Sequence, residues 1–219
     1  MKYKLVIFDM DGTILDTLQD LADATNYALL QNGFQKRTVD EIRRFVGNGV
    51  VKLIERACPE RTPPEIQENV LRSFAEYYGA HCDDNTRPYD GILALLHKLH
   101  AEGIKCAVDS NKPEFAVQKL CARYFPGLFD FALGSRDGCK NKPDAGAVNE
   151  ILSELHIEKS EAVFVGDSDV DIETAQNAGI LCIGVEWGFR GREFLFSHGA
   201  HVTAQNCAEL ETILWQDNG

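Results

Sequence analysis

Short apolar segments alternate along the chain with longer segments of helical periodicity, and this alternation is compatible with few folds. The short segments are almost continuously apolar, which is typical of strands buried on both faces of a parallel sheet. The longer segments carry apolar residues three and four positions apart and predict connecting helices. The predicted strands are residues 4–8, 104–108, 131–133, 162–165 and 181–185, and the predicted helices are residues 92–101, 116–122, 148–155 and 172–178. We therefore expect an α/β fold with a doubly wound, Rossmann-like parallel sheet that binds ligands at the carboxyl ends of its strands.

One gap interrupts this alternation. About 90 residues separate the first two predicted strands, far more than a single crossover needs. Within the gap, residues 18–30, 39–45, 50–57 and 66–78 have helical patterns, with breaks at Asn32-Gly33, Gly47-Asn48-Gly49 and Pro63-Pro64. We expect residues 15–85 to form an inserted α-helical cap domain, and residues 1–14 and 86–219 to form the α/β core domain. The insertion leaves the sheet just after its first strand, so it can form a lid over the end of that strand.

Composition excludes several classes of function. The formal net charge is −12, which disfavours nucleic-acid binding because such binding depends on basic patches. The same charge repels phosphate, so an anion site must be built locally from a metal ion, a few cations and backbone N–H groups. The seven cysteines include no C-x-x-C pair, and no apolar stretch reaches the length of a membrane span or a signal peptide. We expect a cytoplasmic protein with no nucleic-acid or membrane partner.

The most informative motif is FDMDGT, residues 8–13, at the end of the first predicted strand. Asp9 and Asp11 are two positions apart, so their carboxylates can converge on one site. Such a pair can hold a hard cation, or one carboxylate can attack while the other transfers a proton. A solvated turn is the simpler explanation of the motif taken alone, since Asp and Gly are common in turns.

A second acidic motif, VFVGDSDVD, follows another predicted strand and opens a helix. Asp167, Asp169 and Asp171 lie at that helix start, where one acid can cap free N–H groups. Three acids exceed what capping requires, and their mutual repulsion is costly unless a cation lies nearby. The motif therefore adds a second set of carboxylates to the same predicted edge of the sheet.

Two further motifs supply hydrogen-bond donors and a cation. Ser110 and Asn111 follow the second predicted strand and precede a helix whose free N–H groups favour an anion, although simple helix capping explains them equally well. Lys142 precedes Pro143 and a helix, and its ammonium suits phosphate, although a lone loop lysine is normally just solvated. Asp109 is an unusual acid beside a phosphate site; if it pointed inward it would require another cation, and strand alternation favours an outward direction for one of Asp109 and Ser110.

All four motifs lie at the carboxyl ends of predicted parallel strands, or at helix starts beside them, where such folds bind ligands. A nucleophile, an acid, a hydroxyl, a cation and metal-binding carboxylates together form the set of groups needed for phosphoryl transfer. The six histidines lie on predicted helices or in loops and no acid cluster is placed with them, so Ser/His or Cys/His chemistry has no comparable support.

With these motifs in this order, the chain resembles the haloacid dehalogenase-like hydrolase superfamily over almost its whole length. The helical insertion after the first motif is similar to that superfamily's helical cap of the first type. In closer detail the chain is similar to phosphoglycolate phosphatases and their relatives, through FVGNGV at residues 45–50, RPYDGI at 87–92, SNKP at 110–113 and GVEWGF at 184–189.

The resemblance implies a Mg²⁺-dependent phosphatase that hydrolyses a small phosphorylated metabolite, such as phosphoglycolate, through a phospho-aspartate. Asp9 would be the nucleophile and a metal ligand. Asp11 would be the general acid and then the general base, and its backbone carbonyl would also bind the metal. The implied phosphoryl-binding residues are Ser110 and Lys142, and the implied metal site is completed by Asp167, with Asp171 as a ligand or a close partner.

A second anion site is expected in the cap. Gly47, Asn48 and Gly49 precede a predicted helix, so their N–H groups and the Asn48 amide can bind a second acidic group of the substrate, although a hinge or a helix cap would explain the same residues. Thr13 and Asn111 complete the candidate substrate-binding residues. Thr13 also favours a hydrolase, since the superfamily's sugar-phosphate mutases often have Val at that position.

Rival functions share parts of this pattern. A pyrophosphatase or a sugar-phosphate mutase would use the same site. A phosphorelay receiver has Asp, Ser or Thr, and Lys on a similar sheet, but its Asp follows a middle strand and it has no large insertion after strand one. A regulatory protein with a degenerate site is a further alternative, although every expected catalytic residue is present. We expect a monomer or a homodimer.

Overall fold

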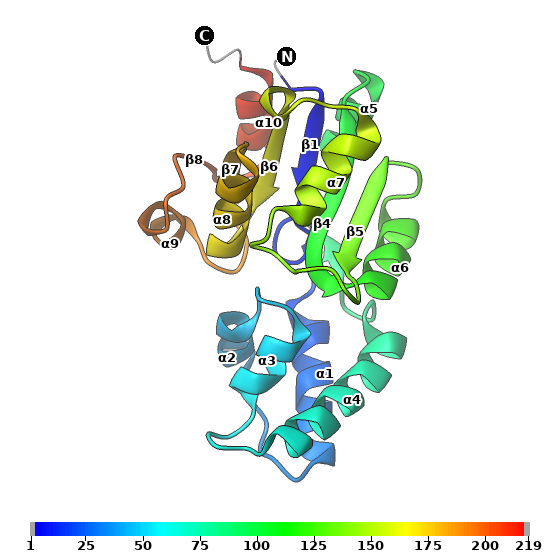
Figure 1. Ribbon diagram of the computed structural model, residues 1–219, viewed down its shortest axis with the longest axis vertical. Helices are drawn as coiled ribbons and strands as arrows, with labels where there is room; N and C mark the ends of the chain where they lie inside the picture. Colours follow the sequence, from blue (N-terminus) through cyan, green and yellow to red (C-terminus); the bar gives the residue numbers. More distant parts are fainter. Residues whose placement is uncertain (1–2, 217–219) are drawn as a thin grey trace.

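The computed structural model describes residues 3–216, and its core is a six-stranded parallel sheet (Figure 1). The strands lie in the order β5-β4-β1-β6-β7-β8. They are β1 (Leu5–Phe8), β4 (Lys105–Pro113), β5 (Phe131–Ser135), β6 (Ala162–Gly166), β7 (Leu181–Val185) and β8 (Val202–Ala204). The completely buried strand β1 pairs with β4 on one side and β6 on the other, which places the ends of these three strands at the centre of one edge. The predicted α/β class with a parallel sheet is confirmed.

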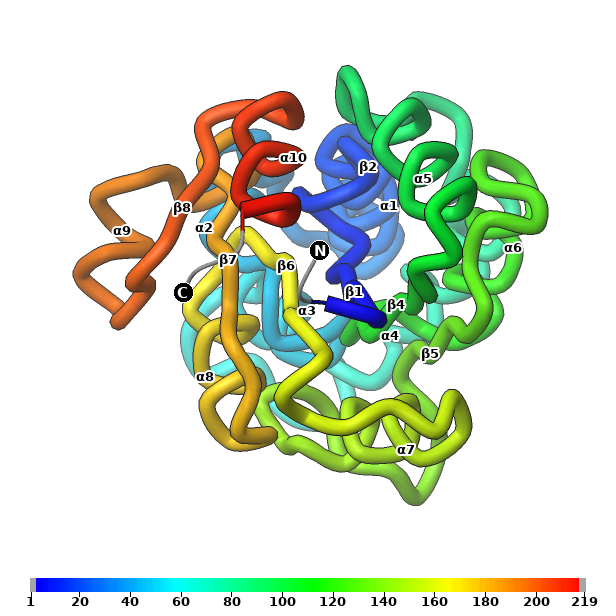
Figure 2. Tube along the Cα trace, turned by 90° about the horizontal axis from the view of Figure 1, so that it is seen from above, coloured from blue at the N-terminus to red at the C-terminus, as the bar shows by residue number. Residues whose placement is uncertain are grey.

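Helices cover both faces of the sheet, as Figure 2 shows from above. One apolar cluster joins the sheet to α5 (Ile92–Ala101), α6 (Glu114–Tyr124) and α10 (Cys207–Trp215). A second cluster joins the opposite face to α7 (Gly146–Leu155), α8 (Asp169–Ala178) and α9 (Arg192–Ser197). The apolar faces of the helices and the two-sided apolar strands thus account for a three-layer core, held mainly by apolar burial.

The insertion consists of four helices that lie beyond the carboxyl edge of the sheet (Figure 1). They are α1 (Leu18–Gln31), α2 (Val39–Phe45), α3 (Val50–Ala57) and α4 (Pro64–His81), and they share an apolar cluster of their own. The chain enters and leaves through two short antiparallel strands, β2 (Leu15–Asp16) and β3 (Arg87–Pro88). Buried Asp20 fixes this connection by accepting hydrogen bonds from the backbone N–H groups of Asn85 and Thr86.

In the six-stranded sheet, β4 and β8 differ most from the sequence expectation. β4 extends to Pro113, beyond the apolar segment that predicted it, and its pairing with β5 shifts register between Asp109 and Pro113. Strand β8 was not predicted, because this three-residue strand at the edge of the sheet has only one fully buried residue and no continuous apolar segment. Within residues 3–216, no helix is both long and apolar enough to cross a membrane.

Candidate active site

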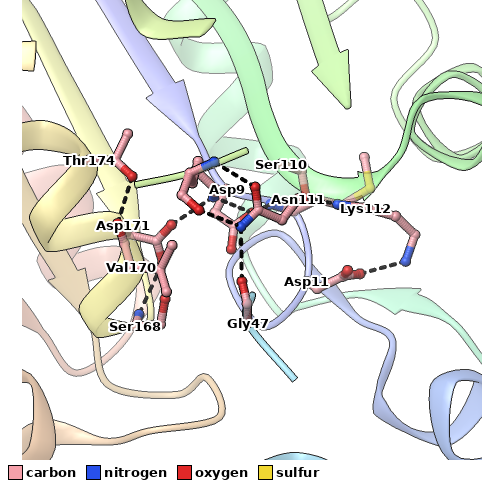
Figure 3. Close-up of polar contacts among 12 residues, drawn as sticks. Asp9, Asp11, Gly47, Ser110, Asn111, Lys112, Ser168, Val170, Asp171 and Thr174 are labelled. Atoms are coloured by element: carbon pink, nitrogen blue, oxygen red, sulfur yellow. Dashed lines mark hydrogen bonds and ion pairs between the residues drawn. The ribbon is translucent and has the colours of Figure 1, made fainter. Parts of the chain in front are cut away.

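The four motifs meet at the end of β1, in a cavity between the sheet and the helical insertion (Figure 3). Asp9 follows β1, Ser110 lies in β4 and Asp167 follows β6, so the three central strands each contribute one side chain. Lys142, from the loop before α7, also lines this cavity. The convergence predicted from the sequence is therefore present in the structure.

Asp9 forms the centre of the site. It is only 8% exposed, and its Oδ1 accepts a hydrogen bond of 2.7 Å from the backbone N–H of Met10. The same oxygen lies 2.9 Å from Nζ of Lys142. Burial raises the pKa of Asp9 to about 7, with the charges of Asp171 and Asp11 adding to the rise and Lys142 opposing it. Ionised Asp9 therefore depends on nearby positive charge.

Lys142 supplies one such charge. Its side chain is almost completely buried, and its Nζ also lies 2.7 Å from Oδ1 of Asp171. Burial by itself lowers the pKa of Lys142, but the carboxylates of Asp171 and Asp9 raise it above the ordinary value. Lys142 is consequently held as a cation beside the Asp9 carboxylate, where a phosphoryl group in transfer needs a compensating positive charge.

Asp171 is engaged with protein groups at both oxygens. Its Oδ2 accepts hydrogen bonds from the backbone N–H of Asp167 at 3.1 Å, and from the backbone N–H and the hydroxyl of Ser168 at 3.0 and 2.7 Å. Oδ1 accepts from Lys142. A side chain at Gly166 would place its Cβ 2.3 Å from Cβ of Asp171, so this close packing requires glycine. Asp171 thus caps the start of α8 and orients Lys142.

Three carboxylates of the site are close enough together to hold a hard divalent cation. Asp9, Asp167 and Asp171 each offer an oxygen within 4.8 Å of the others. Burial, together with the charges of Asp171 and Asp9, raises the pKa of Asp167 well above its ordinary value. Oδ2 of Asp167 accepts a hydrogen bond of 2.6 Å from the backbone N–H of Phe189. Among the described residues, Oδ2 of Asp9 and Oδ1 of Asp167 accept no hydrogen bond, so these oxygens are the available ligands.

The predicted substrate-binding residues divide into two groups. Ser110, Asn111, Gly47 and Gly49 line the cavity. The Asn111 carboxamide is used within the protein, because its oxygen accepts from the backbone N–H of Lys142 at 2.8 Å and its nitrogen donates to the carbonyls of Lys142 and Gly47 at 3.0 and 3.2 Å. Asn111 therefore joins the cap loop to the segment that carries Lys142.

Thr13 and Asn48 lie outside the cavity lining. Thr13 is fully buried and its hydroxyl has no hydrogen-bond partner among residues 3–216, while its carbonyl accepts from the indole of Trp187 at 3.0 Å. The carboxamide oxygen of Asn48 accepts from Arg56 at 2.7 Å, on the solvent side of α3. The structure thus gives both side chains positions away from the substrate cavity, and the backbone of the cap loop is what reaches it.

Sequence reasoning missed Lys112, Tyr78 and Arg190, which also line the cavity. Lys112 forms an ion pair of 2.7 Å with Asp11. The guanidinium of Arg190 donates to the carbonyls of Arg43 and Val46 in the insertion at 2.8 and 2.6 Å. The SNKP motif held a signal for Lys112, but its lysine lies beyond the apolar segment that marked the strand. Nothing in the local pattern around Tyr78 or Arg190 distinguished them from surface residues.

Asp109 faces away from the active-site cavity. It lines a second cavity with Arg136 and Glu150, is 3% exposed, and its Oδ2 has no hydrogen-bond partner within residues 3–216. Burial raises the pKa of Asp109 to about 6, with Lys142 opposing the rise. Asp109 therefore does not face the phosphate site, and positive charge near it comes from Lys142 and Arg136.

Replacing Asp109 with Asn is expected to stabilise the protein at neutral pH. Between about pH 4 and 6, Asp109 is protonated in the folded state and ionised in the unfolded state. The contribution of Asp109 to the free energy of unfolding therefore falls as pH rises through that window, and it stays low above it. The Asp109→Asn variant lacks this penalty. The amount by which its free energy of unfolding exceeds that of wild type should be roughly 2 kcal/mol larger at pH 7.5 than at pH 4. Urea unfolding in chelator at both pH values measures the gain; an equal difference at both would contradict the assignment.

A parallel α/β sheet that ends in an aspartate, a buried lysine and an acidic cluster, with a helical insertion above it, defines a class of phosphoryl-transfer hydrolases. Residues 6–185 match the sequence profile of the haloacid dehalogenase-like hydrolases, and the chain belongs to this family. The prediction of a phosphatase is confirmed by this match and by the relatives described next.

The chain is similar to several proteins named phosphoglycolate phosphatase and to solved structures. It is 34% identical over 192 residues to the phosphoglycolate phosphatase of Pseudomonas fluorescens strain Pf0-1, covering 85% of this chain and 70% of that protein. It is also 34% identical over 199 residues to the phosphoglycolate phosphatase of Psychrobacter arcticus, covering 86% of each. A crystal structure of a Lactobacillus delbrueckii subsp. bulgaricus protein, presented as a candidate phosphoglycolate phosphatase, superposes with a TM-score of 0.92 at 41% identity, covering 98% of this chain and 99% of that chain.

Proposed function

We propose that this protein is a Mg²⁺-dependent phosphatase that hydrolyses a small phosphorylated acid of the phosphoglycolate type through a phospho-aspartate on Asp9. The observation that carries the proposal is the buried pairing of Asp9 with Lys142 beside the carboxylate of Asp167, on the floor of a cavity that the helical insertion covers. The chain's relatives include phosphoglycolate phosphatases, which supports this substrate class.

The chemistry proceeds in two displacements. The Asp9 carboxylate attacks phosphorus, the bond from phosphorus to the leaving oxygen breaks, and Asp11 donates a proton to that oxygen. Asp11 then takes a proton from a water molecule, which attacks phosphorus, releases phosphate and restores Asp9. Lys142 and the hydroxyl of Ser110 compensate the charge of the phosphoryl oxygens. A magnesium ion held by Asp9 and Asp167, with the Asp11 carbonyl, would supply further charge compensation.

The lining of the cavity supports a small, doubly anionic substrate. Three cations face it: Lys112, Lys142 and Arg190. The insertion contributes apolar side chains, including Leu21 and Leu53, and the free backbone N–H groups at the start of α3. Since phosphate occupies the side of Lys142, an acidic group at the other end of a short substrate can approach the start of α3.

We also propose that residues 15–85 act as the cap domain and that residues 1–14 and 86–219 form the core domain.

The specificity constants of four substrate classes test this proposal. We expect kcat/KM for phosphoglycolate to exceed the values for hexose phosphates and nucleotides by at least about 100-fold, because a closed cap excludes bulky leaving groups. Pyrophosphate is the main competitor, since it also has two anionic ends. A nucleotide or a phosphoprotein as the best substrate would contradict the proposal. The compartment and the oligomeric state remain predictions.

A substitution in the cap loop tests whether that loop seats on the core. Gly49 has a φ of +84°, and a Cβ there would lie 3.3 Å from Asn141 and 3.5 Å from the Asn111 carbonyl. Gly49→Ala should therefore lower kcat/KM for phosphoglycolate about 10-fold or more. Gly33→Ala is the matched control, because Gly33 has a φ of +76° but no atom within 4 Å of the added Cβ. Gly49→Ala should lose about 1–3 kcal/mol of stability, because its φ of 84° and ψ of 169° form a conformation nearly restricted to glycine, and Gly33→Ala about 1 kcal/mol. Equal activities would contradict the seating of the loop.

A further inference from the structure

Lys112 is a second buried lysine at the site, and the chemistry described above does not use it. It lies in β4, and its side chain is 1% exposed. Its Nζ donates a hydrogen bond of 2.7 Å to Oδ1 of Asp11 and a second hydrogen bond to the hydroxyl of Tyr78 (Figure 3 shows the contact with Asp11). Lys142, in contrast, is paired with Asp9 and Asp171, so the two lysines serve different carboxylates.

A buried ammonium is costly to maintain unless its partners are well placed. Removing an ammonium from water costs several kcal/mol, and a pair with good geometry and further hydrogen bonds is needed to offset that cost. Replacing such a pair with apolar residues of similar size is often neutral or stabilising. The pair of Lys112 and Asp11 is therefore a weak device for stability alone, and its place beside the reacting groups points to a role in the reaction.

Tyr78 connects this pair to the cap. It lies in α4, is fully buried, and stacks on Phe74 of the same helix with ring centroids 5.1 Å apart. Nζ of Lys112 lies 4.9 Å from the centroid of the Tyr78 ring. A continuous set of contacts thus runs from the apolar cluster of the insertion, through Tyr78 and Lys112, to Asp11 in the core loop after β1.

The contact restricts how Asp11 can act. Because Oδ1 accepts the ammonium of Lys112, Oδ2 is the oxygen that can carry a proton to the leaving group. Proton transfer requires a separation of about 2.6–3.2 Å between heavy atoms and good alignment, so a side chain free to rotate would be less effective. Fixing one oxygen of Asp11 restricts that rotation, and the fixing partner is itself held by a helix of the cap.

We propose that Lys112 and Tyr78 are positioning residues that orient Asp11 for proton transfer and make this orientation depend on contact between α4 and the core. The inference rests on the proposed function, in which Asp11 is the general acid. It assigns a task to a lysine and a tyrosine outside the acidic motifs. It also explains why the cap supplies a hydroxyl at full burial, where an apolar side chain would pack equally well.

The dependence on the leaving group tests the proposal. Tyr78→Phe removes one hydroxyl and keeps the ring, and Lys112→Met removes the charge and keeps most of the chain. With phosphoglycolate and glycerol 2-phosphate, whose alkoxide leaving groups need a proton, kcat should fall about 10-fold for Tyr78→Phe and about 100-fold for Lys112→Met. With 4-nitrophenyl phosphate, which needs little protonation, kcat should change less than about 3-fold in both variants, and KM should change little for any substrate in Tyr78→Phe, which keeps all three cations of the cavity. Tyr77→Phe is the matched control, on the same helix but outside the cavity, and should retain wild-type rates.

A double substitution separates this proposal from the proposed function. Asp11→Asn alone should show the same dependence on leaving group, and the Asp11→Asn/Tyr78→Phe variant should lose no more than Asp11→Asn does. Equal losses of Asp11→Asn on alkyl and aryl phosphates would contradict the general-acid role itself. If Asp11→Asn shows the split but Tyr78→Phe loses activity equally on both kinds of substrate, or adds its loss in the double variant, the positioning proposal is wrong. Tyr78→Phe decides the matter even if Lys112→Met does not fold.

Discussion

Replacing Asp9 with Asn is expected to lower kcat on the order of 10,000-fold or more, with the protein still folded. The amide keeps the shape of the side chain but cannot displace an alkoxide from phosphorus. Folding should tolerate the change, because burial already disfavours the ionised carboxylate of Asp9 and Lys142 keeps Asp171 as a partner. Phosphate release under saturating substrate, and thermal unfolding of the same preparation, measure the two quantities.

Two controls make this result decisive. Asp90→Asn changes an exposed aspartate outside the active-site cavity and should stay within about 2-fold of the wild-type rate. Because the new amide at position 9 can deamidate back to aspartate, the mass of the peptide that contains it must be checked before each assay. More than a few per cent of wild-type turnover in a freshly prepared, undeamidated variant would rule out Asp9 as the nucleophile.

Removing divalent metal with a chelator is expected to lower turnover at least about 1,000-fold. Buried Asp9 and Asp167 each carry an oxygen without a hydrogen-bond partner among the described residues, and their negative charges oppose the approach of an anionic phosphate. Magnesium should restore the activity. Calcium should not, because its looser coordination allows a different carboxylate geometry and disturbs in-line attack.

A measurement without turnover tests the same metal site. Magnesium should raise the unfolding temperature of the wild-type protein in a concentration-dependent way, since an ion that binds only the folded state stabilises it by mass action. The Asp167→Asn variant should lose most of this rise, while Asp169→Asn, which changes an acid that does not line the cavity, should keep it. Full activity in excess chelator, or an equal rise in both variants, would contradict the assignment.

The core of the site could be predicted from the sequence because its residues are fixed by topology. Asp9, Ser110 and Asp167 lie in or directly after parallel strands that are neighbours in the sheet, and the ends of such strands meet wherever the sheet forms. Strand alternation predicted an outward direction for one of Asp109 and Ser110, and the structure shows that Asp109 is the one outside the active-site cavity. The apolar pattern alone was sufficient for these inferences, since strand position determines where each side chain lies.

The rest of the site depends on tertiary contacts that no local pattern encodes. Lys112 lies in the part of β4 where the pairing with β5 shifts register, beyond the apolar segment that predicted the strand, and a register shift leaves no trace in the apolar pattern. The Asn48 side chain points toward Arg56 and accepts its hydrogen bond. Gly47 and Gly49 on either side have positive φ, and the sequence does not show which way such a loop turns the side chain between them. Tyr78 contacts Lys112 only because α4 packs against the core, and the helical period of the sequence cannot reveal that contact.

Chemical trapping of an acyl phosphate tests the central claim most directly. The enzyme is mixed with magnesium and an excess of phosphoglycolate, quenched in acid during turnover, and treated with borohydride, which reduces an aspartyl phosphate to homoserine. Peptide mass spectrometry should then find homoserine at position 9 in the wild-type protein, and none at that position in Asp9→Asn or without substrate. Homoserine at another aspartate, or none at position 9 in an enzyme that is turning over and accumulates an intermediate, would contradict a phospho-aspartate on Asp9.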